Sequence, residues 1–248
     1  MKIKFCIPTS EERFNKIKHV LLPTLLKNKI DPDDIYFFWS QSTEVSIQKD
    51  SEYNVNIVNI NYNSIDFNAF IGIVDAGLTS DYWFYLHDTC YVADYFYKKI
   101  VDIENINQYD VIRATDVGTC MNYGLYKNNF LYSIKTALLN SRNYDFSESS
   151  LQNQKLLAVH HENGLCYPLK VKHFVDMYDS NNMYDVSKLK FGSYSHEPVI
   201  FDHENLGPCK YYTDDVQRIL FFFKETGIYK RSANYKPCND VEKWILKL

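Results

Sequence analysis

Short hydrophobic runs alternate along the chain with segments of helical spacing, and the clearest run ends in two polar residues. It extends from Tyr82 to Leu86, and His87 and Asp88 follow it directly. Such a run of β-formers bounded by polar residues is typical of a strand that is buried on both faces. The preceding stretch, Ser64 to Thr79, has apolar residues at the i, i+3, i+4, i+7 spacing of a buried helix face. The sequence therefore predicts a helix, then a strand with two polar residues at its carboxyl end.

The same two patterns occur on both sides of this helix and strand. Further strands are expected at residues 2–8, 35–39, 55–60, 110–114 and 165–175. Further helices are expected to start at Thr9, Asp94, Phe130 and Thr213, to pass through Leu156, and to cover residues 241–248. Strands and helices in alternation imply crossover connections and a parallel sheet covered by helices. The predicted fold class is α/β, with a mostly parallel, Rossmann-like sheet flanked by helices in a single domain.

Five residues carry predictions about where helices begin, bend and end. Thr9 is followed three residues later by Glu12, which is the pattern of a capping box that opens a helix. Pro23 falls inside that helix and is expected to kink or split it. Gly77 and Gly227 follow helical patterns and are expected to be C-terminal caps.

Composition narrows the class of protein. The chain has 248 residues and no linker-like stretch, which favours one domain. Its formal net charge is −4 and its basic residues form no stripe, which argues against a nucleic-acid partner. The 6 cysteines form no C-x-x-C pair and no secretory leader is seen, so we expect reduced thiols and a cytoplasmic protein. No apolar run approaches the length of a transmembrane segment, which leaves a peripheral membrane contact as an alternative.

Several common catalytic motifs are missing from the sequence. It contains no G-x-G-x-x-G, P-loop, G-x-S-x-G or H-E-x-x-H, so dehydrogenase, P-loop kinase, α/β-hydrolase and zincin interpretations lose their main support. The segment 160–162, His-His-Glu, is interpreted as a solvated helix end, because adjacent helical residues point about 100° apart. Asp88 is the main candidate for a functional residue, because it follows a predicted strand and ligands bind at the carboxyl ends of strands in an open parallel sheet. The alternative is that Asp88 is a turn residue that closes the strand.

Three passages resemble the GT-A glycosyltransferase fold, and within it the family 2-like enzymes. Residues 7–9, Ile-Pro-Thr, end the first strand, with Arg13 just beyond. Residues 66–77 lead into residues 81–89, which is similar to the family's small-residue helix, Ala-Gly cap and strand ending in an Asp-x-Asp motif. Residues 123–126 precede a helix, like the family's acceptor-side strand. By the order of elements, the resemblance covers residues 1 to about 165.

The resemblance implies a transferase that moves a sugar from a nucleotide-sugar donor, a UDP- or GDP-sugar, to a hydroxyl of a glycan or protein acceptor. Residues 1 to about 115 would form the nucleotide-sugar-binding half, and residues 116–248 the acceptor half. The residues implied at the donor site are Pro8, Thr9, Arg13, Trp39, Asp66, Asn68, His87 and Asp88.

The resemblance also implies a divalent metal ion, and here the sequence departs from the family. Asp88 would coordinate manganese (Mn²⁺) or magnesium (Mg²⁺), hard ions that prefer oxygen ligands and that bridge a diphosphate. The family motif has two acids, whereas residues 87–89 read His-Asp-Thr and hold one. The metal could then take His87 or a later ligand such as His196 or His203, or be absent.

The catalytic base is a second departure. An inverting transferase needs a carboxylate that takes the proton of the acceptor hydroxyl. In the family this acid commonly opens a helix as Glu-Asp, whereas here Glu148 is followed by Ser149. Asp145 and Asp116 are the other candidates. For Glu148 the alternative is a carboxylate that simply stabilises a helix start.

Two other functions fit parts of the pattern. The reduced acid motif favours a catalytically silent member of the fold that acts as a binding or scaffold module. A nucleotidyltransferase on a related sheet is a weaker alternative, because the glycine-rich N-terminal loop is missing. The polar, tyrosine-rich segment 177–201 is expected to be a lid or part of the acceptor site.

Overall fold

The structure, a computed structural model, describes residues 1–40, 42–113, 123–154, 174–176, 220–223 and 227–231. The chain divides into two compact units whose segments alternate along the sequence. The first unit comprises Met1–Phe14, Asp31–Asp88 and Asn105–Val186. The second comprises Asn15–Ile30, Thr89–Glu104 and Ser187–Leu248. The expected halves, residues 1 to about 115 and about 116 to 248, stay a prediction.

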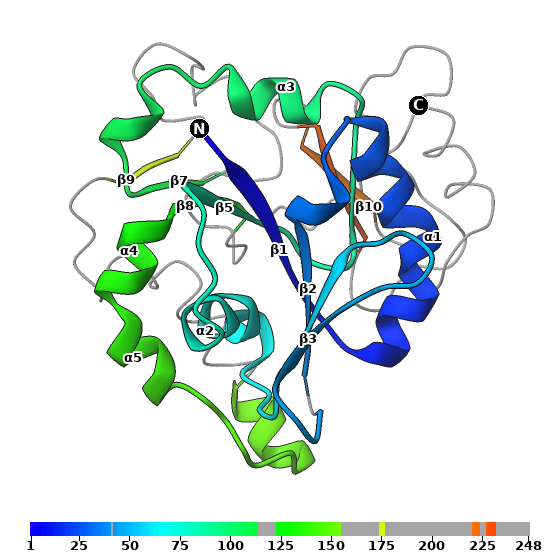
Figure 1. The fold of residues 1–248 in the computed structure, drawn as a ribbon, viewed down its shortest axis with the longest axis vertical. Coiled ribbons are helices and arrows are strands. Elements are labelled where there is room, and N and C mark those ends of the chain that lie inside the picture. The colour runs from blue at the N-terminus through cyan, green and yellow to red at the C-terminus, as the bar shows by residue number, and fades with distance from the viewer. Residues whose placement is uncertain (41, 114–122, 155–173, 177–219, 224–226, 232–248) are drawn as a thin grey trace. The chain divides into compact units, whose positions relative to one another are not determined.

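The described strands of the first unit form an eight-stranded sheet in the order β3-β4-β2-β1-β5-β8-β7-β9 (Figure 1). Their bounds are β1 (Ile3–Thr9), β2 (Ile35–Trp39), β3 (Ser46–Lys49), β4 (Asn56–Asn59), β5 (Tyr82–Tyr85), β7 (Val111–Arg113), β8 (Gly124–Lys127) and β9 (Phe174–Asp176). Neighbouring strands from β4 through β2 and β1 to β5 are parallel, as are β7 and β9. Within this sheet, β3 and β8 run antiparallel to their neighbours. The predicted α/β class with a mostly parallel sheet is confirmed.

The helices of the first unit include α2 (Asn68–Asp75), α4 (Asn128–Ser133) and α5 (Lys135–Asn140). Helix α2 contacts β1 and β2 of the sheet and packs beside α4 and α5 (Figure 1). It approaches β2 closely because Gly72 has no side chain between the helix and the ring of Phe38. The helix ends as predicted at Gly77, which has a φ of +67° and lets the amide of Leu78 donate to the carbonyl of Ile73 over 3.0 Å.

The central strands of the sheet are buried on both faces. All four residues of β5 are buried, and so are six of the seven residues of β1. Successive side chains of a strand point to opposite faces, so both faces of the sheet are covered at its centre. Burial of each large apolar side chain contributes about 1.5–3 kcal/mol to the free energy of folding. Because both faces of these strands are buried, successive residues are apolar, and the strands are the clearest hydrophobic runs in the sequence.

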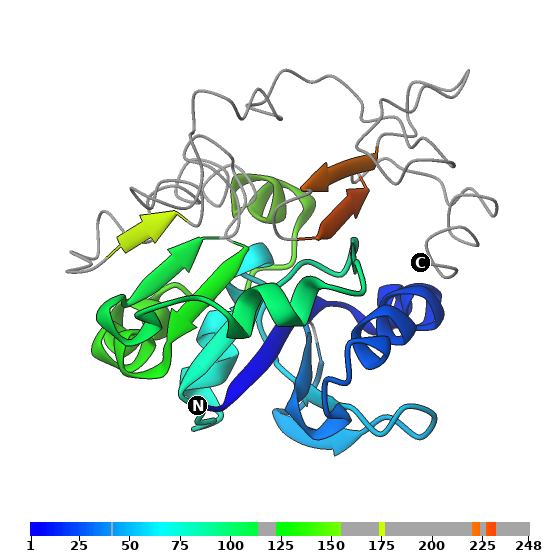
Figure 2. The same cartoon turned by 90° about the horizontal axis from the view of Figure 1, so that it is seen from above.

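In the second unit the described strands β10 (Leu220–Phe223), β11 (Ile228–Arg231) and β6 (Cys90–Val92) form an antiparallel sheet in that order. Figure 2 shows β10 and β11 side by side and running in opposite directions. Helix α1 (Glu11–Lys27) begins in the first unit and continues into the second, which also holds α3 (Phe96–Val101).

A buried asparagine at the end of α1 organises the second unit. The amide nitrogen of Asn28 donates to the carbonyl of Ala93 over 3.0 Å. Its amide oxygen accepts the backbone N–H of Tyr97 over 3.1 Å. The hydroxyl of Thr24, one turn earlier, accepts the N–H of Val92 over 3.3 Å. These bonds join α1 to the segment that runs from β6 into α3.

The start of α1 differs from the prediction. Ser10 is the capping residue: its hydroxyl accepts the N–H of Arg13 over 3.3 Å, and its carbonyl accepts the N–H of Phe14 over 2.8 Å. Thr9 is instead the last residue of β1, so the capping box predicted for it is wrong. The helix also continues through Pro23 as one element, so the split expected there does not occur.

Other element boundaries also differ. The helix expected over residues 64–79 is a 3-10 helix, Ile65–Phe67, followed by α2. The helix expected from Phe130 is divided into α4 and α5. Residues 220–223 were expected inside a helix but form β10, because Leu-Phe-Phe-Phe pairs with β11 and suits a strand. Gly227 accordingly lies in the β10–β11 connection with a φ of +72° instead of ending a helix.

Several predicted features lie outside the described residues. They are Asp116, His196, His203, the 160–162 cluster, the 177–201 segment, residues 165–173 of the expected strand, and the expected helices through Leu156, over 213–219 and at 241–248. Among the residues that are described, no helix combines the length and the hydrophobicity that crossing a bilayer requires. Cys6 and Cys90 are buried.

Candidate active site

The carboxyl ends of the parallel strands meet at one edge of the sheet in the first unit. Thr9 at the end of β1 is in register with Trp39 at the end of β2, and Trp39 is in register with Asn59 at the end of β4. Beyond β5, the N–H of Leu86 still bonds to the carbonyl of Cys6 over 3.2 Å, so the chain remains beside β1 as it reaches Asp88. This is the edge at which open α/β sheets bind ligands.

Asp88 is buried, is hydrogen-bonded to one of the residues predicted with it and forms an ion pair with another. The hydroxyl of Thr9 donates to Asp88 Oδ2 over 2.9 Å. The Nη1 atom of Arg13 lies 3.6 Å from the same oxygen. The Asp88 side chain is 6% exposed, whereas the Arg13 side chain is 54% exposed. A buried carboxylate is stable when a cation and a hydrogen-bond donor accompany it, and here β1 and the first turn of α1 supply them.

His87 forms a second cluster next to Asp88. Its Nε2 atom lies 3.6 Å from Asp66 Oδ1. Its ring contacts Tyr85 and Tyr123 edge-on, at centroid distances of 5.4 and 4.8 Å. The hydroxyl of Tyr85 donates to the backbone carbonyl of Asp66 over 2.9 Å, which fixes the 3-10 helix that carries this carboxylate. The cluster therefore offers a carboxylate and an imidazole between two aromatic rings.

Trp39 lies at the same edge through the strand register. Its ring is 5.4 Å from that of Phe14 between centroids. The indole Nε1 is buried, and the structure provides no hydrogen-bond acceptor for it among the described residues. Pro8 is buried within β1 directly before Thr9.

Asn68 is placed differently from the other predicted donor-site residues. It is 3% exposed, and its amide oxygen accepts the N–H of Ser64 over 2.7 Å. Its amide nitrogen donates to Asn63 Oδ1 over 3.2 Å. These bonds hold the turn before α2, so the side chain already has partners on both sides of its amide group. The role expected for it at the ribose or base stays a prediction.

The two described candidates for the catalytic base are Asp145, which lies in a loop, and Glu148, which lies at the start of the helix that follows it. Residues 148–154 are helical, so Glu148 opens a helix as predicted. The hydroxyl of Ser147 caps it by accepting the N–H of Ser150 over 3.3 Å. Asp145 accepts the N–H of Ser147 over 2.9 Å, and this bond to the backbone holds the pKa of its carboxyl below the ordinary value. A lowered pKa makes a carboxylate a weaker proton acceptor.

A buried asparagine connects this loop to the turn before Asp66. Asn143 accepts the N–H of Asn63 at its carbonyl over 2.8 Å. Its amide nitrogen donates to the carbonyls of Asn63 and Asp145 over 3.1 and 2.8 Å. Its own N–H donates to the hydroxyl of Ser64 over 3.0 Å. The loop that carries the candidate base is therefore held against the segment that carries Asp66.

The structure thus brings together Thr9, Arg13 and Asp88 by direct contact, and His87 and Asp66 beside them. Sequence reasoning did not assign Tyr85 and Tyr123 to the site. Tyr85 lies two residues before His87 and therefore points to the same side of an extended chain, a signal that the alternation contains. No local signal in the sequence places Tyr123 there.

The described residues do not form a centre for the expected divalent metal ion. None of them belong to a group of three or more His, Cys, Asp or Glu side chains that could hold one. Oδ2 of Asp88 accepts the hydroxyl of Thr9 and faces the guanidinium of Arg13. The expected Mn²⁺ or Mg²⁺ stays a prediction.

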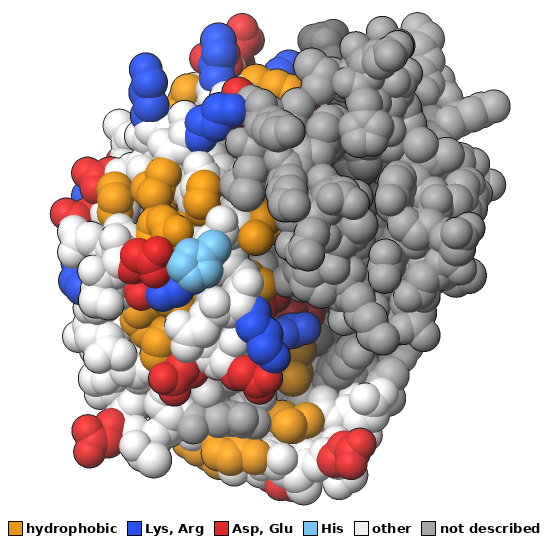
Figure 3. Space-filling view, turned by 90° about the vertical axis from the view of Figure 1, so that its right-hand side faces the viewer, with side chains coloured by type: hydrophobic (Ala, Val, Ile, Leu, Met, Phe, Trp, Pro, Cys, Tyr) orange, Lys and Arg blue, Asp and Glu red, His pale blue; other side chains and the backbone are white. Residues whose placement is uncertain are grey.

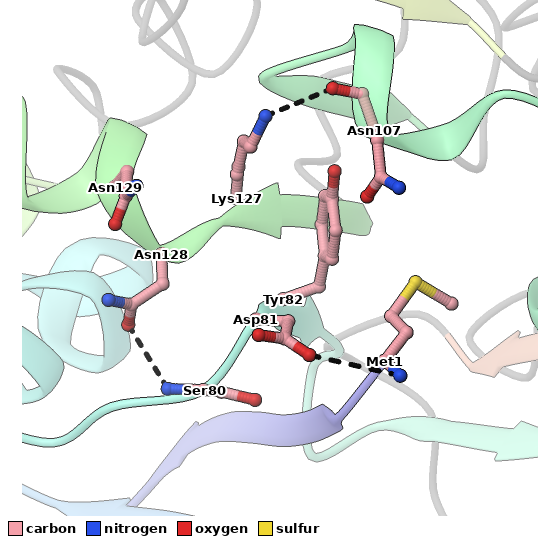
Figure 4. A pocket seen from close by; sticks show the side chains of 8 residues that line it. All are labelled: Met1, Ser80, Asp81, Tyr82, Asn107, Lys127, Asn128 and Asn129. Atoms are coloured by element: carbon pink, nitrogen blue, oxygen red, sulfur yellow. Dashed lines mark hydrogen bonds and ion pairs between the residues drawn. The ribbon is translucent and has the colours of Figure 1, made fainter.

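A separate cavity opens at the opposite edge of the sheet (Figure 4). It has a volume of about 360 Å³ and is lined by residues that include Asp81, Tyr82 and Asn107. Lys127 donates to the carbonyl of Asn107 over 3.0 Å at its rim. None of the residues predicted for function line this cavity.

Charges are mixed on the face of the molecule shown in Figure 3. Acidic and basic side chains of the described residues lie interspersed there with hydrophobic ones. The described part of that face therefore has no extended basic surface of the kind that binds a nucleic-acid backbone.

Comparisons with known proteins give distant structural likenesses. No protein-family model and no curated protein match the sequence. The structure of TarS 1-349 from S. aureus is similar, with a TM-score of 0.45, 13% identity, and coverage of 72% of this chain and 58% of that one. Its complex with UDP gives a TM-score of 0.46, 12% identity and the same coverages of 72% and 58%. Its complex with UDP-GlcNAc gives a TM-score of 0.40 and 12% identity, with coverage of 54% of this chain and 47% of that one.

The chain spans less than three fifths of the TarS 1-349 structure. Likenesses of this size do not define a function.

Proposed function

We propose that this chain is a glycosyltransferase that moves a sugar from a nucleotide-sugar donor to a hydroxyl acceptor. The observation that carries the proposal is the pairing of buried Asp88 with Arg13 and Thr9 at the carboxyl edge of a mostly parallel sheet. A buried carboxylate needs a partner such as this half-exposed arginine, and ligands of such sheets bind at that edge.

The donor would bind along the ends of β1, β2 and β5. The base would lie near Pro8, Thr9 and Trp39, where the buried indole N–H of Trp39 is a potential donor to it. The ribose would lie near Asp66, whose carboxylate accepts hydroxyl hydrogen bonds. A UDP-sugar or GDP-sugar is the expected donor, and a hydroxyl of a glycan or protein is the expected acceptor.

The reaction exchanges one bond at the anomeric carbon. The acceptor oxygen forms a bond to this carbon while the bond to the diphosphate oxygen breaks, and the electron pair leaves with the diphosphate. A carboxylate takes the acceptor's proton. Glu148 suits this role better than Asp145, because the carboxylate of Asp145 is already bonded to Ser147 and has a lowered pKa.

A thermal-shift panel of UDP-, GDP-, dTDP- and CMP-sugars tests the proposal. A ligand at about a hundred times its dissociation constant stabilises the folded state by about 2.7 kcal/mol, which is readily detected. We expect one nucleotide class to raise the melting temperature and its sugar donor to be hydrolysed slowly without acceptor. Asp88→Ala should weaken both effects, whereas replacement of Asp81, an exposed carboxylate before the same strand, by alanine should change neither.

A binding module without catalytic activity is the second candidate, and the single carboxylate of residues 87–89 favours it. In the same panel it would give a thermal shift without any hydrolysis. No shift with any donor would contradict the transferase proposal.

A further inference from the structure

We propose that the guanidinium of Arg13, oriented by Asp88, binds the donor's diphosphate and that donor binding therefore needs no divalent metal ion. This inference rests on the proposed transferase function. It assigns to Asp88 a positioning role, in place of the metal-ligand role that the family resemblance implies.

The first argument is the environment of the Asp88 carboxylate. Oδ2 accepts the Thr9 hydroxyl at 2.9 Å and faces Arg13 Nη1 at 3.6 Å. A divalent cation at this oxygen would stand next to the positive charge of the guanidinium, which repels it. The described surroundings of Asp88 therefore fit an anchored arginine better than a metal ion.

The second argument is the difference in exposure within the pair. The Asp88 side chain is 6% exposed and the Arg13 side chain is 54% exposed. A ligand that arrives from solvent at this edge therefore meets the cation and not the carboxylate. A metal ion that entered here would have to displace this cation to reach the Oδ2 atom of Asp88.

The third argument is the chemistry of the guanidinium. Arginine has five N–H donors in a planar fork, and a contact through Nη1 leaves other N–H groups of the fork for a second anion. Phosphate oxygens match this fork with two parallel hydrogen bonds. One carboxylate can thus fix the orientation of Arg13 while the same side chain binds a phosphate.

Such an arginine would also assist the chemical step. When the bond between the anomeric carbon and the diphosphate breaks, the electron pair stays on the phosphate oxygen, which gains negative charge. A fixed cation at that oxygen stabilises the charge as it develops. The acceptor's proton goes to the carboxylate base, so the balance of atoms and charge requires no metal ion.

Isothermal titration of UDP and GDP into the full chain tests the inference, once in EDTA and once in Mn²⁺. For the nucleotide that binds, we expect dissociation constants within threefold of each other in the two buffers. Arg13→Gln should weaken binding at least tenfold in both, and Arg13→Lys should recover part of the loss, because it keeps the charge and loses the fork. Lys16→Gln, an exposed cation one turn further along α1, is the matched control and should bind as the wild type does.

Asp88→Asn separates positioning from metal binding. The variant keeps an oxygen that accepts the Thr9 hydroxyl but loses the charge that orients Arg13. We expect binding that is weaker, still independent of Mn²⁺, and less impaired than in Arg13→Gln, with the fold checked by circular dichroism.

Two results would overturn the inference, and they differ in whether the proposed transferase function survives. Binding that disappears in EDTA, returns with Mn²⁺ and survives Arg13→Gln would make Asp88 a metal ligand and leave the transferase proposal intact. Failure of UDP and GDP to bind in either buffer, together with no shift in the sugar-nucleotide panel, would refute the proposed function as well.

Discussion

Replacement of Gly72 by alanine should destabilise the first unit, although alanine is the better helix former. A Cβ at this position would lie 2.3 Å from Cδ1 and 2.6 Å from Cε1 of Phe38. Phe38 is fully buried in β2, directly before Trp39, so its ring has little room to move. Overpacking of a core costs about 1–3 kcal/mol. A contact as short as 2.3 Å belongs at the upper end of that range. The helix propensity of alanine returns about 1 kcal/mol, so we expect a net loss of about 2 kcal/mol in the free energy of unfolding.

A double-mutant cycle with Phe38→Leu identifies the cause of this loss. Urea unfolding followed by circular dichroism gives the four free energies, with an unchanged m-value as the condition for comparison. In the Phe38→Leu background, the ring that the new methyl group meets is gone. The cost of Gly72→Ala should therefore fall by about 1 kcal/mol or more, as is usual for residues in contact.

Gly77→Ala is the matched control for this cycle. A Cβ at Gly77 would meet nothing within 4 Å, but the φ of +67° is unfavourable for alanine. We expect a cost of about 1–2 kcal/mol that is the same in both backgrounds. The steric argument is refuted if Gly72→Ala costs nothing, or if its cost is as large in Phe38→Leu as in the wild type.

Three further predictions concern buried amides and one carboxylate. Asn143→Ala should lower the free energy of unfolding by about 2–3 kcal/mol and speed hydrogen exchange over residues 144–150, since the bonds to Asn63 and Asp145 are lost; unchanged exchange would contradict it. Asn28→Ala should cost about 2 kcal/mol in a thermal melt through the bonds to Ala93 and Tyr97, and an unaltered melting temperature would argue against this role. The lowered pKa of Asp145 means that its contribution is present above about pH 4 and is lost as the pH falls through the folded-state pKa. Asp145→Asn should therefore weaken the fall in urea midpoint between pH 5 and pH 2.5, and an identical fall in both proteins would contradict the pKa argument.

The central strands of the sheet could be predicted because burial on both faces leaves a continuous hydrophobic run. β1, β2 and β5 are such strands, and the sequence indicates all three. The edge strand β3, Ser46–Lys49, has four exposed residues. It forms by pairing with β4, which no run or alternation in its own residues indicates. Pattern therefore identifies strands by their burial and misses those that backbone pairing alone maintains.

The start of α1 shows how a distant contact overrides a local signal. Thr9 and Glu12 have the spacing of a capping box, which describes only neighbours in the chain. In the structure, the Thr9 hydroxyl donates to Asp88, 79 residues away, and Ser10 caps the helix in its place. The sequence could place both residues at the carboxyl edge of the sheet but could not indicate that they bond to each other.

Under the proposed function, one explanation covers two observations. Residues 87–89 hold one acid where the family motif has two, and that acid, Asp88, forms an ion pair with Arg13. A motif with two acids can gather a metal ion, whereas one acid beside an arginine is close to neutral and has no such attraction. His87 lies beside Asp66, and Asp88 is the carboxylate that faces Arg13. An exposed guanidinium on a helix start, fixed by a carboxylate on a rigid strand end, then supplies the positive charge that a departing diphosphate requires. The loss of the second acid therefore argues against catalysis only if the cation has to be a metal ion.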